Sequence, residues 1–381
     1  MKKKNILLLT TVGGFIPQFE IENVKILKTF GFQIFYASDF THPVYAQREE
    51  LLDALGVRRL QISIKKSPFS FAAHRKAFLE LSEIVKAYEI GLVHCHTPVG
   101  GFLGRMLGRR FGEELQVIYT AHGFHFYSGA PVTGWLFYPV ERYLARYTDA
   151  LITINGEDFR RAGKWKLRPG GKVYQIPGVG IDWERLKLPE AEKESPRRQF
   201  HIPKNGILLA SVGELNRNKN HQTVIRTLEK SRRKDLYYLI AGEGEARRKL
   251  RRMAKRAGLA SRVRLLGYQR EVAPLLAAAD VFLFPSRREG LGMAALEAMA
   301  MGLPVVAADN RGSREYVVPG VNGYLCPWND ARAFAKAIEE LADNPRKREE
   351  MGRAAKKTAE RFSAEKTARV MKQVYEEMQK R

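Results

Sequence analysis

Cysteine is almost absent from this chain of 381 residues, which holds only Cys95 and Cys326. Two thiols cannot build a disulfide framework or a cysteine-based zinc cage, and such sparing use is typical of a reducing compartment. Long hydrophobic runs are also missing, because no stretch reaches the roughly 18 apolar residues that mark a membrane-spanning helix. These absences favour a cytoplasmic globular protein. At roughly 150 residues per domain, the length predicts two or three domains.

Acidic residues are scarce beside basic ones. The chain has 41 Asp and Glu against 65 Lys and Arg, which gives a formal net charge of +24. Such a charge attracts nucleic acids, anionic membranes or phosphorylated ligands. No recognisable nucleic-acid motif accompanies the charge, and the cations are spread over both halves of the chain. A basic nucleic-acid-binding protein stays one alternative.

Short apolar runs alternate with longer amphipathic ones along the whole chain. The runs that we predict as strands are Ile6–Leu9, Phe32–Ala37, Leu92–His94, Val117–Thr120, Ala150–Ile154, Val173–Ile176, Ile207–Val212, Tyr237–Ala241, Val263–Leu265, Val281–Phe284 and Val305–Ala307. Most are continuously hydrophobic, as in parallel strands that are covered on both faces. The alternation with helical patterns predicts an α/β fold with two Rossmann-like domains.

The alternation is interrupted once, by residues 188–205, which contain three prolines and many charges. We predict a linker there, between an N-terminal domain at 1–187 and a C-terminal domain at 206–362. Residues 363–381 form an amphipathic helix whose apolar face we expect to dock back on the N-terminal domain.

One loop motif follows the predicted strand at 281–284 and precedes a helical pattern. A glycine-containing loop at this place points free N–H groups from the carboxyl edge of a sheet, which suits an anion. Gly292, Met293 and Ala294 would supply these groups, while Glu289 and Glu297 would accept hydrogen bonds from sugar hydroxyls. From the residues alone, two solvated glutamates beside an ordinary loop fit about equally well.

A second motif, 212–221, also lies between a strand and a helix. Within it, Arg217 and Lys219 could reach a diphosphate, the arginine as a fork and the lysine as a point charge. A polar turn with solvated charges is the alternative.

These two motifs together resemble glycosyltransferase family 4. Glu289 and Glu297 match the E-x7-E pattern of that family, and the resemblance covers nearly the whole chain. The segment 120–127 is similar to a subgroup of bacterial enzymes that build exopolysaccharides and capsules. The resemblance implies the GT-B architecture, in which two Rossmann-like domains face each other across a cleft.

The resemblance also implies a donor site for a nucleotide-sugar. The matching positions are Gly13, Gly14, Asn216, Arg217, Lys219, Tyr268, Glu289, Gly292, Met293, Ala294 and Glu297. Glu297 would hold the ribose hydroxyls, Glu289 the transferred sugar, and Lys219 the phosphates. The backbone near Tyr268 would meet the base, and His122 would approach the donor sugar from the N-terminal domain.

Catalysis is assigned by the resemblance to His122, Glu289, Lys219 and Arg217. Many family members have an arginine where this chain has Glu214, and Arg217 would replace it from inside the loop. The implied activity is a retaining transfer of a hexosyl or N-acetylhexosaminyl group, from a UDP-sugar to a lipid-linked saccharide. The donor is a substrate, so no cofactor is expected. A nucleotide-sugar epimerase of the same fold is the second alternative, although the E-x7-E context argues against it.

No Asp-x-Asp pair occurs in the sequence, so we expect metal-independent chemistry and no metal site. His94 and His96 flank Cys95 at the end of a strand and could look like a metal pair. Without a third or fourth ligand nearby in the sequence, a structural role is favoured. His125 fits a packing role or a substrate contact equally well.

Cations and aromatic side chains are interleaved in one segment of the N-terminal half. The residues that we predict to contact an anionic membrane are Lys65, Lys66, Phe69, Phe71, Arg75 and Lys76. Such a segment suits the headgroup region of a bilayer. The sequence therefore predicts a peripheral protein on the inner face of the cell membrane.

Overall fold

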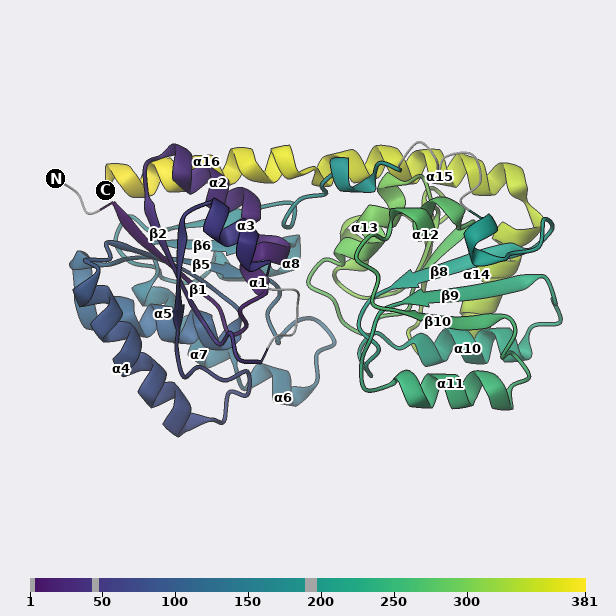
Figure 1. Ribbon diagram of the computed structural model, residues 1–381, viewed down its shortest axis with the longest axis horizontal. Helices are drawn as coiled ribbons and strands as arrows, with labels where there is room; N and C mark the ends of the chain where they lie inside the picture. Colours follow the sequence, from purple (N-terminus) through teal and green to yellow (C-terminus); the bar gives the residue numbers. More distant parts are fainter. Residues whose placement is uncertain (1–3, 43–47, 189–196) are drawn as a thin grey trace. The chain divides into compact units, whose positions relative to one another are not determined.

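The computed structural model describes residues 4–42, 48–188 and 197–381. The chain forms two compact units; in Figure 1 the first runs from purple to teal and includes the yellow helix at the C-terminus, and the second runs from teal through green to yellow-green. The first comprises Met1–Gly180 with Ala364–Arg381, and the second comprises Ile181–Ser363. Each unit is an α/β structure with one parallel sheet, as predicted.

The chain leaves the first unit at Gly180, before the predicted boundary at residue 187. Ile181 already belongs to the second unit, because its N–H donates to Phe362 O at 2.8 Å. Of the predicted linker 188–205, residues 189–196 lie outside the described residues. The part that follows packs on the second unit, since Arg197 pairs with Asp280 at 3.1 Å.

The first unit contains a seven-stranded sheet in the order β3-β2-β1-β4-β5-β6-β7, and every neighbouring pair is parallel. Its strands are β1 (Asn5–Leu9), β2 (Gln33–Ser38), β3 (Val57–Gln61), β4 (Leu92–His96), β5 (Gln116–Ala121), β6 (Ala150–Thr153) and β7 (Lys172–Gln175). Its helices are α1 (Phe15–Phe19), α2 (Ile21–Thr29), α3 (Glu49–Ala54), α4 (Phe71–Ala87), α5 (Pro98–Phe111), α6 (Val132–Trp135), α7 (Tyr138–Leu144), α8 (Gly156–Ala162) and α16 (Ala364–Lys380).

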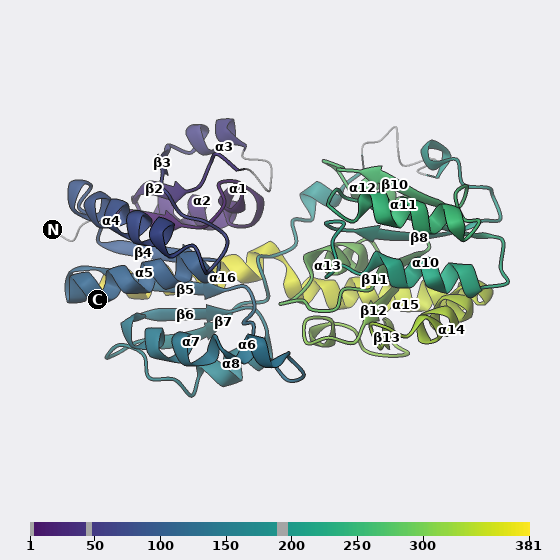
Figure 2. The ribbon, with the colours of Figure 1, turned by 90° about the horizontal axis from the view of Figure 1, so that it is seen from below.

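The second unit contains a six-stranded parallel sheet in the order β10-β9-β8-β11-β12-β13. Its strands are β8 (Ile207–Val212), β9 (Leu236–Ala241), β10 (Val263–Gly267), β11 (Val281–Phe284), β12 (Val305–Ala308) and β13 (Gly323–Cys326). Its helices are α10 (His221–Lys230), α11 (Arg247–Arg256), α12 (Ala273–Ala278), α13 (Met293–Ala300), α14 (Ala331–Asp343) and α15 (Pro345–Ala359). Figure 2 shows helices on both faces of each sheet, which explains the continuous hydrophobicity of the central strands.

The sequence analysis missed the strands β3 and β13, which lie at the sheet edges. β3 reads VRRLQ and buries only Val57 fully, so it carries neither a continuous apolar run nor a clear alternation. An edge strand needs less apolar sequence because only one neighbour pairs with it.

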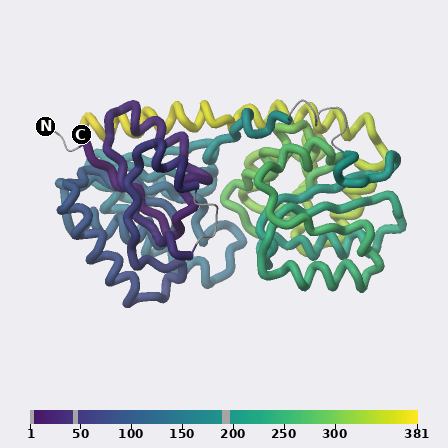
Figure 3. Tube along the Cα trace, in the orientation of Figure 1, coloured from purple at the N-terminus to yellow at the C-terminus, as the bar shows by residue number. Residues whose placement is uncertain are grey.

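Helix α16 returns the end of the chain to the first unit (Figure 3). It buries Met371, Val374, Tyr375 and Met378, which lie at helical spacing, and it packs against α2. The Tyr375 hydroxyl hydrogen-bonds His94 Nδ1 at 2.9 Å and so fixes the helix to β4. None of the helices in the described ranges is long and apolar enough to cross a membrane.

Candidate functional site

The loop between β11 and α13 lies at the carboxyl edge of the second sheet. Gly292 at its end has a φ of +108°, and a Cβ there would lie 2.6 Å from the Phe284 ring. Only glycine fits this left-handed turn against the ring. The turn starts α13 at Met293, so the first helical turn presents the N–H groups that have no partner within a helix.

The loop between β8 and α10 lies directly beside the first loop. Arg287 N donates to Asn218 O at 2.9 Å, and Asn218 Nδ2 donates to Arg288 O at 2.9 Å. Asn220 adds a bond from its Nδ2 to Pro285 O at 3.0 Å. The structure therefore joins the two motifs that the sequence analysis identified separately.

An ion pair links the functional side chains of these two loops. Lys219 Nζ lies 2.7 Å from Glu289 Oε1, and 23% and 14% of the two side chains are exposed. Asn216 Oδ1 accepts a hydrogen bond from Lys219 N at 2.9 Å, which fixes the backbone that carries the lysine. A cation and a carboxylate thus stand together at the place where two loops meet.

Arg217 points to a different place from Lys219. It lines a cavity of about 600 Å³ together with Arg226, Lys249 and Arg287, and neither Lys219 nor Glu289 lines that cavity. Burial, with Arg217 and Arg226 nearby, lowers the pKa of Arg287. The cavity is strongly cationic and suits an anion.

Glu297 lies in the second turn of α13 and is half-buried. Burial raises its pKa to about 7, while Arg185 acts in the opposite direction and Asp182 in the same direction. The carboxyl group is therefore close to half ionised at neutral pH. Tyr268, which follows β10, has an exposed side chain, so only its backbone is firmly placed.

The first glycine loop lies between β1 and α1. Gly13 is buried, and a Cβ at this position would lie 2.4 Å from Phe40 Cδ1. The Tyr36 hydroxyl contacts the carbonyl oxygens of Val12 and Gly13 at 3.0 Å each, so the loop is rigid. Gly14 follows as the residue before helix α1.

A cluster of Glu20, His96 and His122 lies at the carboxyl edge of the first sheet. His96 Nδ1 and His122 Nε2 are 3.2 Å apart, and Glu20 Oε1 lies 3.6 Å and 3.5 Å from them. Glu20 Oε1 is buried and makes no hydrogen bond within the described part of the chain, whereas Asn23 donates to Glu20 Oε2. Three donor atoms this close could hold a divalent cation.

Burial dominates the titration of the cluster. It raises the pKa of Glu20 to about 8 and lowers that of His122 to about 4. It also lowers the pKa of His96, and all three groups are therefore neutral near pH 7. A neutral His122 has a lone pair with which it can accept a proton or a hydrogen bond.

The sequence analysis missed Glu20, and it assigned His96 a structural role because no further ligand lies near it in the sequence. The structure brings Glu20 and His122 to it from α1–α2 and the end of β5. His94, in contrast, bonds Thr120 Oγ1 at 2.8 Å and Tyr375, which is a structural arrangement.

The predicted membrane segment lies before and in the first turns of α4. Phe69 and Phe71 are 74% and 73% exposed, and Lys66, Arg75 and Lys76 are exposed as well. Two of the cations in this segment have a carboxylate partner: Lys65 Nζ lies 3.2 Å from Asp39 Oδ2, and Lys76 Nζ lies 3.9 Å from Glu80 Oε1. Burial acts to raise the pKa of Asp39, but hydrogen bonds from Thr41, Lys65 and Gln61 outweigh it, so the pKa is lowered.

Comparisons with known proteins agree with this geometry. The family "Glycosyl transferase 4-like" matches residues 6–155, and "Glycosyl transferases group 1" matches residues 192–358. EpsD of Bacillus subtilis (strain 168), which is named as a glycosyltransferase, is 37% identical over 377 residues, or 98% of this chain and 96% of its own. The UDP-Gal:alpha-D-GlcNAc-diphosphoundecaprenol alpha-1,3-galactosyltransferase of Escherichia coli is 28% identical over 275 residues, or 71% of this chain and 70% of its own.

Solved structures share the fold. Sucrose-phosphate synthase of Thermosynechococcus elongatus has a TM-score of 0.80 at 21% identity, with 98% of both chains covered. Anabaena HepE has a TM-score of 0.78 at 20% identity, with 99% of both chains covered. The paired loops of the second unit, the two parallel sheets and the match to EpsD lead to one conclusion: this chain is a glycosyltransferase of family 4 with the GT-B fold.

Proposed function

We propose that this glycosyltransferase moves a hexosyl or N-acetylhexosaminyl group from a UDP-sugar to a lipid-linked saccharide, with retention of the anomeric configuration. The observation that carries the donor half of the proposal is the Lys219–Glu289 ion pair, beside the first turn of α13. A lysine and free N–H groups suit a diphosphate, and a carboxylate suits sugar hydroxyls. The Escherichia coli relative, whose name specifies a UDP-linked donor and a diphosphoundecaprenol acceptor, supports both substrate classes.

Each donor group would have its own contact. Glu297 would accept hydrogen bonds from the ribose hydroxyls, Glu289 would hold the transferred sugar, and Lys219 would hold the diphosphate. Gly292, Met293 and Ala294 would add backbone N–H groups to the diphosphate. Arg217 would act from the cationic cavity at its side, and Gly13, Gly14, Asn216 and Tyr268 would shape the donor site.

The transfer breaks the bond between the sugar C1 and the oxygen of the β-phosphate. A new bond forms between C1 and the acceptor hydroxyl oxygen on the same face of the sugar. The acceptor proton passes to the β-phosphate oxygen of the leaving UDP, so atoms and charges balance. Lys219 and the first turn of α13 stabilise the negative charge that develops there, and neutral His122 accepts a hydrogen bond from the donor sugar.

The proposed diphosphate clamp consists of the Lys219 and Arg217 side chains and the backbone N–H groups of Gly292 to Ala294. Because these groups can balance the charge of the diphosphate, we propose chemistry that needs no metal ion. Glu20, His96 and His122 are the group in the described residues that could hold one. They belong to the first unit, whereas Lys219 and the first turn of α13 belong to the second, so the proposed diphosphate contacts include none of these three residues.

Two other functions remain as alternatives. An epimerase of the same fold would need the donor site but no acceptor. A nucleic-acid-binding protein would need neither, and only the net charge of +24 favours it. Binding of duplex DNA and of anionic vesicles, compared in one salt series, tests the nucleic-acid-binding alternative.

A lipid-linked acceptor has to be met at a bilayer, so we also propose peripheral membrane association. Lys66, Arg75 and Lys76 are exposed beside the exposed Phe69 and Phe71. Each cation near an anionic surface contributes about 1 kcal/mol. Changing the three cations to Glu should release the protein from anionic vesicles, whereas Lys65, which pairs with Asp39, is left unchanged to preserve the loop.

The first experiment is a thermal-shift screen of nucleotide-sugars. A ligand at 100 times its Kd stabilises the folded protein by about 2.7 kcal/mol, which is easily resolved. The selected donor is then incubated with a short-chain lipid diphosphate saccharide, and the anomeric configuration of the product is read by NMR. A shift with UDP-sugars and an α-linked product from an α-linked donor supports the proposal. Rearrangement of the donor without acceptor identifies an epimerase.

A further inference from the structure

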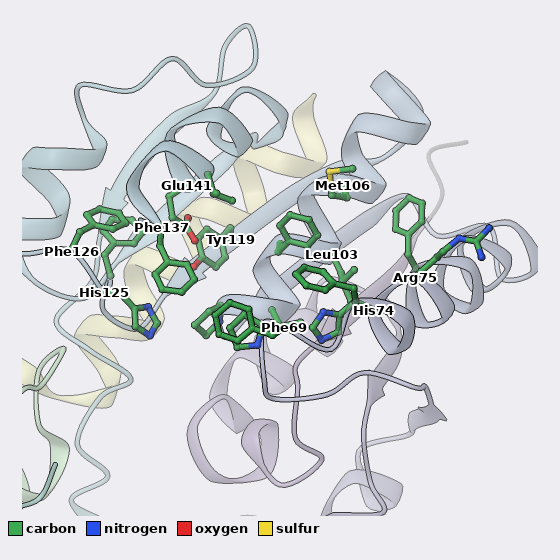
Figure 4. Close-up of a pocket in the computed structure, with 18 of the residues that line it drawn as sticks. Phe69, His74, Arg75, Leu103, Met106, Tyr119, His125, Phe126, Phe137 and Glu141 are labelled. Atoms are coloured by element: carbon green, nitrogen blue, oxygen red, sulfur yellow. The ribbon is translucent and has the colours of Figure 1, made fainter. Parts of the chain in front are cut away.

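An apolar pocket of about 450 Å³ lies in the first unit, within the size range of small-molecule sites. Its walls come from α4, from α5, from the loop after β5 and from residues 137–141 (Figure 4). Leu103 and Met106 of α5 face it from one side, and Phe126 and Phe137 from another. Such a lining offers hydrocarbon contact along most of its surface.

Exposed apolar side chains continue from this pocket onto the surface. Phe69, Phe71, Phe102 and Val140 are both exposed and part of the pocket wall. Exposed apolar side chains that gather at one pocket are typical of an interaction site.

The pocket is held open by a buried ion pair. Arg105 of α5 is fully buried, and its Nη1 lies 2.7 Å from Glu141 Oε2 of α7. The Arg105 guanidinium also lies over the Tyr119 ring, 4.0 Å from its centroid, and its Nε donates to Gly101 O at 2.7 Å. Because this pair connects two walls, the pocket is formed before any ligand arrives.

Charge and position define the kind of ligand. His74 and the exposed Arg75 lie at one side of the pocket, where Arg75 supplies a cation. At another side, residues 123–126 belong to the loop that carries His122. The pocket is thus apolar inside, cationic at its rim and adjacent to the proposed reaction site in the same unit.

We infer that this pocket binds the hydrocarbon chain of the lipid-phosphate acceptor and places the attached phosphate beside Arg75 at its rim. The inference rests on the proposed lipid-linked acceptor and adds where the lipid is recognised. The hydrocarbon chain fills the apolar interior, and the phosphate with the saccharide that it carries stays outside the pocket at its rim. The acceptor is then selected by its lipid as well as by its sugar.

The test measures binding of n-alkyl phosphates of increasing length to the full chain by calorimetry, below the concentrations at which they form micelles. Each buried methylene should increase affinity about fourfold until the pocket is filled, after which affinity levels off. Inorganic phosphate alone should bind far more weakly. An affinity that rises without levelling indicates partition onto an open apolar face, and an affinity independent of length overturns the inference.

Variants locate the binding. Phe102→Glu and Met106→Glu each place a carboxylate in the pocket wall and should weaken the longest alkyl phosphate at least tenfold. Leu79→Glu is the matched control, because Leu79 is 49% exposed on α4 but is not part of the pocket wall. Unchanged melting temperatures and donor affinity show that the variants fold. Equal weakening by all three variants, or by none, contradicts the inference.

A soluble saccharide acceptor without a lipid distinguishes this inference from the proposed function. The pocket variants should transfer sugar to the soluble acceptor as fast as wild type does and lose only transfer to the lipid-linked acceptor. This result supports both the proposed function and the pocket assignment. If alkyl phosphates show no length dependence while wild type still glycosylates the lipid-linked acceptor, only the pocket assignment fails. If wild type transfers sugar to neither acceptor, the proposed function fails.

Discussion

The pKa of Glu297 makes donor binding depend on pH in a calculable way. If ribose hydroxyls donate to the ionised carboxylate, binding requires that Glu297 has lost its proton. With a pKa of about 7, the ionised fraction is about 0.9 at pH 8 and about 0.1 at pH 6. Affinity for the donor should therefore fall about tenfold between pH 8 and pH 6, or about 1.4 kcal/mol.

The assay is calorimetric titration of the UDP-sugar that the thermal-shift screen selects. A UDP-sugar is used rather than UDP, because the terminal phosphate of UDP itself titrates near pH 6. Glu297→Gln keeps the shape of the side chain and cannot ionise, so its affinity should not follow this pH curve. Hydrogen bonds to a charged group are worth about 1.5–3 kcal/mol, so at pH 8 both Glu297→Gln and Glu297→Ala should bind roughly tenfold to a hundredfold more weakly than wild type.

Glu271→Gln serves as the control, since Glu271 is exposed in the same unit and should leave both affinity and slope unchanged. The reasoning is refuted if wild type binds equally well at pH 6 and pH 8. It is equally refuted if Glu297→Gln keeps full affinity together with the wild-type pH curve.

Three further predictions concern the metal requirement of the reaction, the role of Arg217 at the diphosphate and the protonation state of Glu20. Activity should survive EDTA, and complete loss that Mn²⁺ or Mg²⁺ restores would contradict the metal-free clamp. Arg217→Ala should lower kcat/KM at least tenfold, or about 1.4 kcal/mol, whereas a silent substitution would show that Lys219 and α13 suffice. Glu20 is protonated in the folded protein up to about pH 8 but ionised in the unfolded chain above about pH 4.5, so its contribution to stability is lost as pH rises through this window. In urea titrations from pH 7 to pH 8, Glu20→Gln should therefore remove a fall in stability of up to about 1.4 kcal/mol per pH unit, and identical slopes would argue against a buried neutral carboxyl.

The two-sheet architecture could be predicted because its central strands are buried on both faces and therefore read as continuous apolar runs. All eleven runs that the sequence predicted overlap strands of the structure. The edge strands β3 and β13 were not predicted, because their residues are partly exposed and do not form a continuous apolar run. The sequence analysis placed the boundary at residue 187 because the prolines and charges begin after it. In the structure the second unit begins earlier, at Ile181, whose N–H donates to Phe362 O.

Site residues could likewise be predicted only where a local sequence motif contains them. Lys219 and Glu289 belong to motifs, and the structure brings them into contact at 2.7 Å. Glu20 belongs to no motif, and only the folded arrangement of the α1–α2 junction and the ends of β4 and β5 brings it to His96 and His122. The apolar pocket of the first unit was not predicted either. Its walls come from segments that are distant in the sequence, whereas a sequence pattern describes a single helix, strand or loop.

The return of α16 has a consequence for biosynthesis. The first unit needs its final helix, yet residues 181–363 must be made before that helix can emerge. At roughly 5–20 residues per second, the ribosome spends about 10–40 s on this interval. During that time the surface that receives Met371, Val374 and Tyr375 is bare, and His94 lacks the tyrosine hydroxyl. A nascent chain of this enzyme therefore offers chaperones an apolar target until residues 364–378 have been made, and a chain that stops before Met371 would keep it.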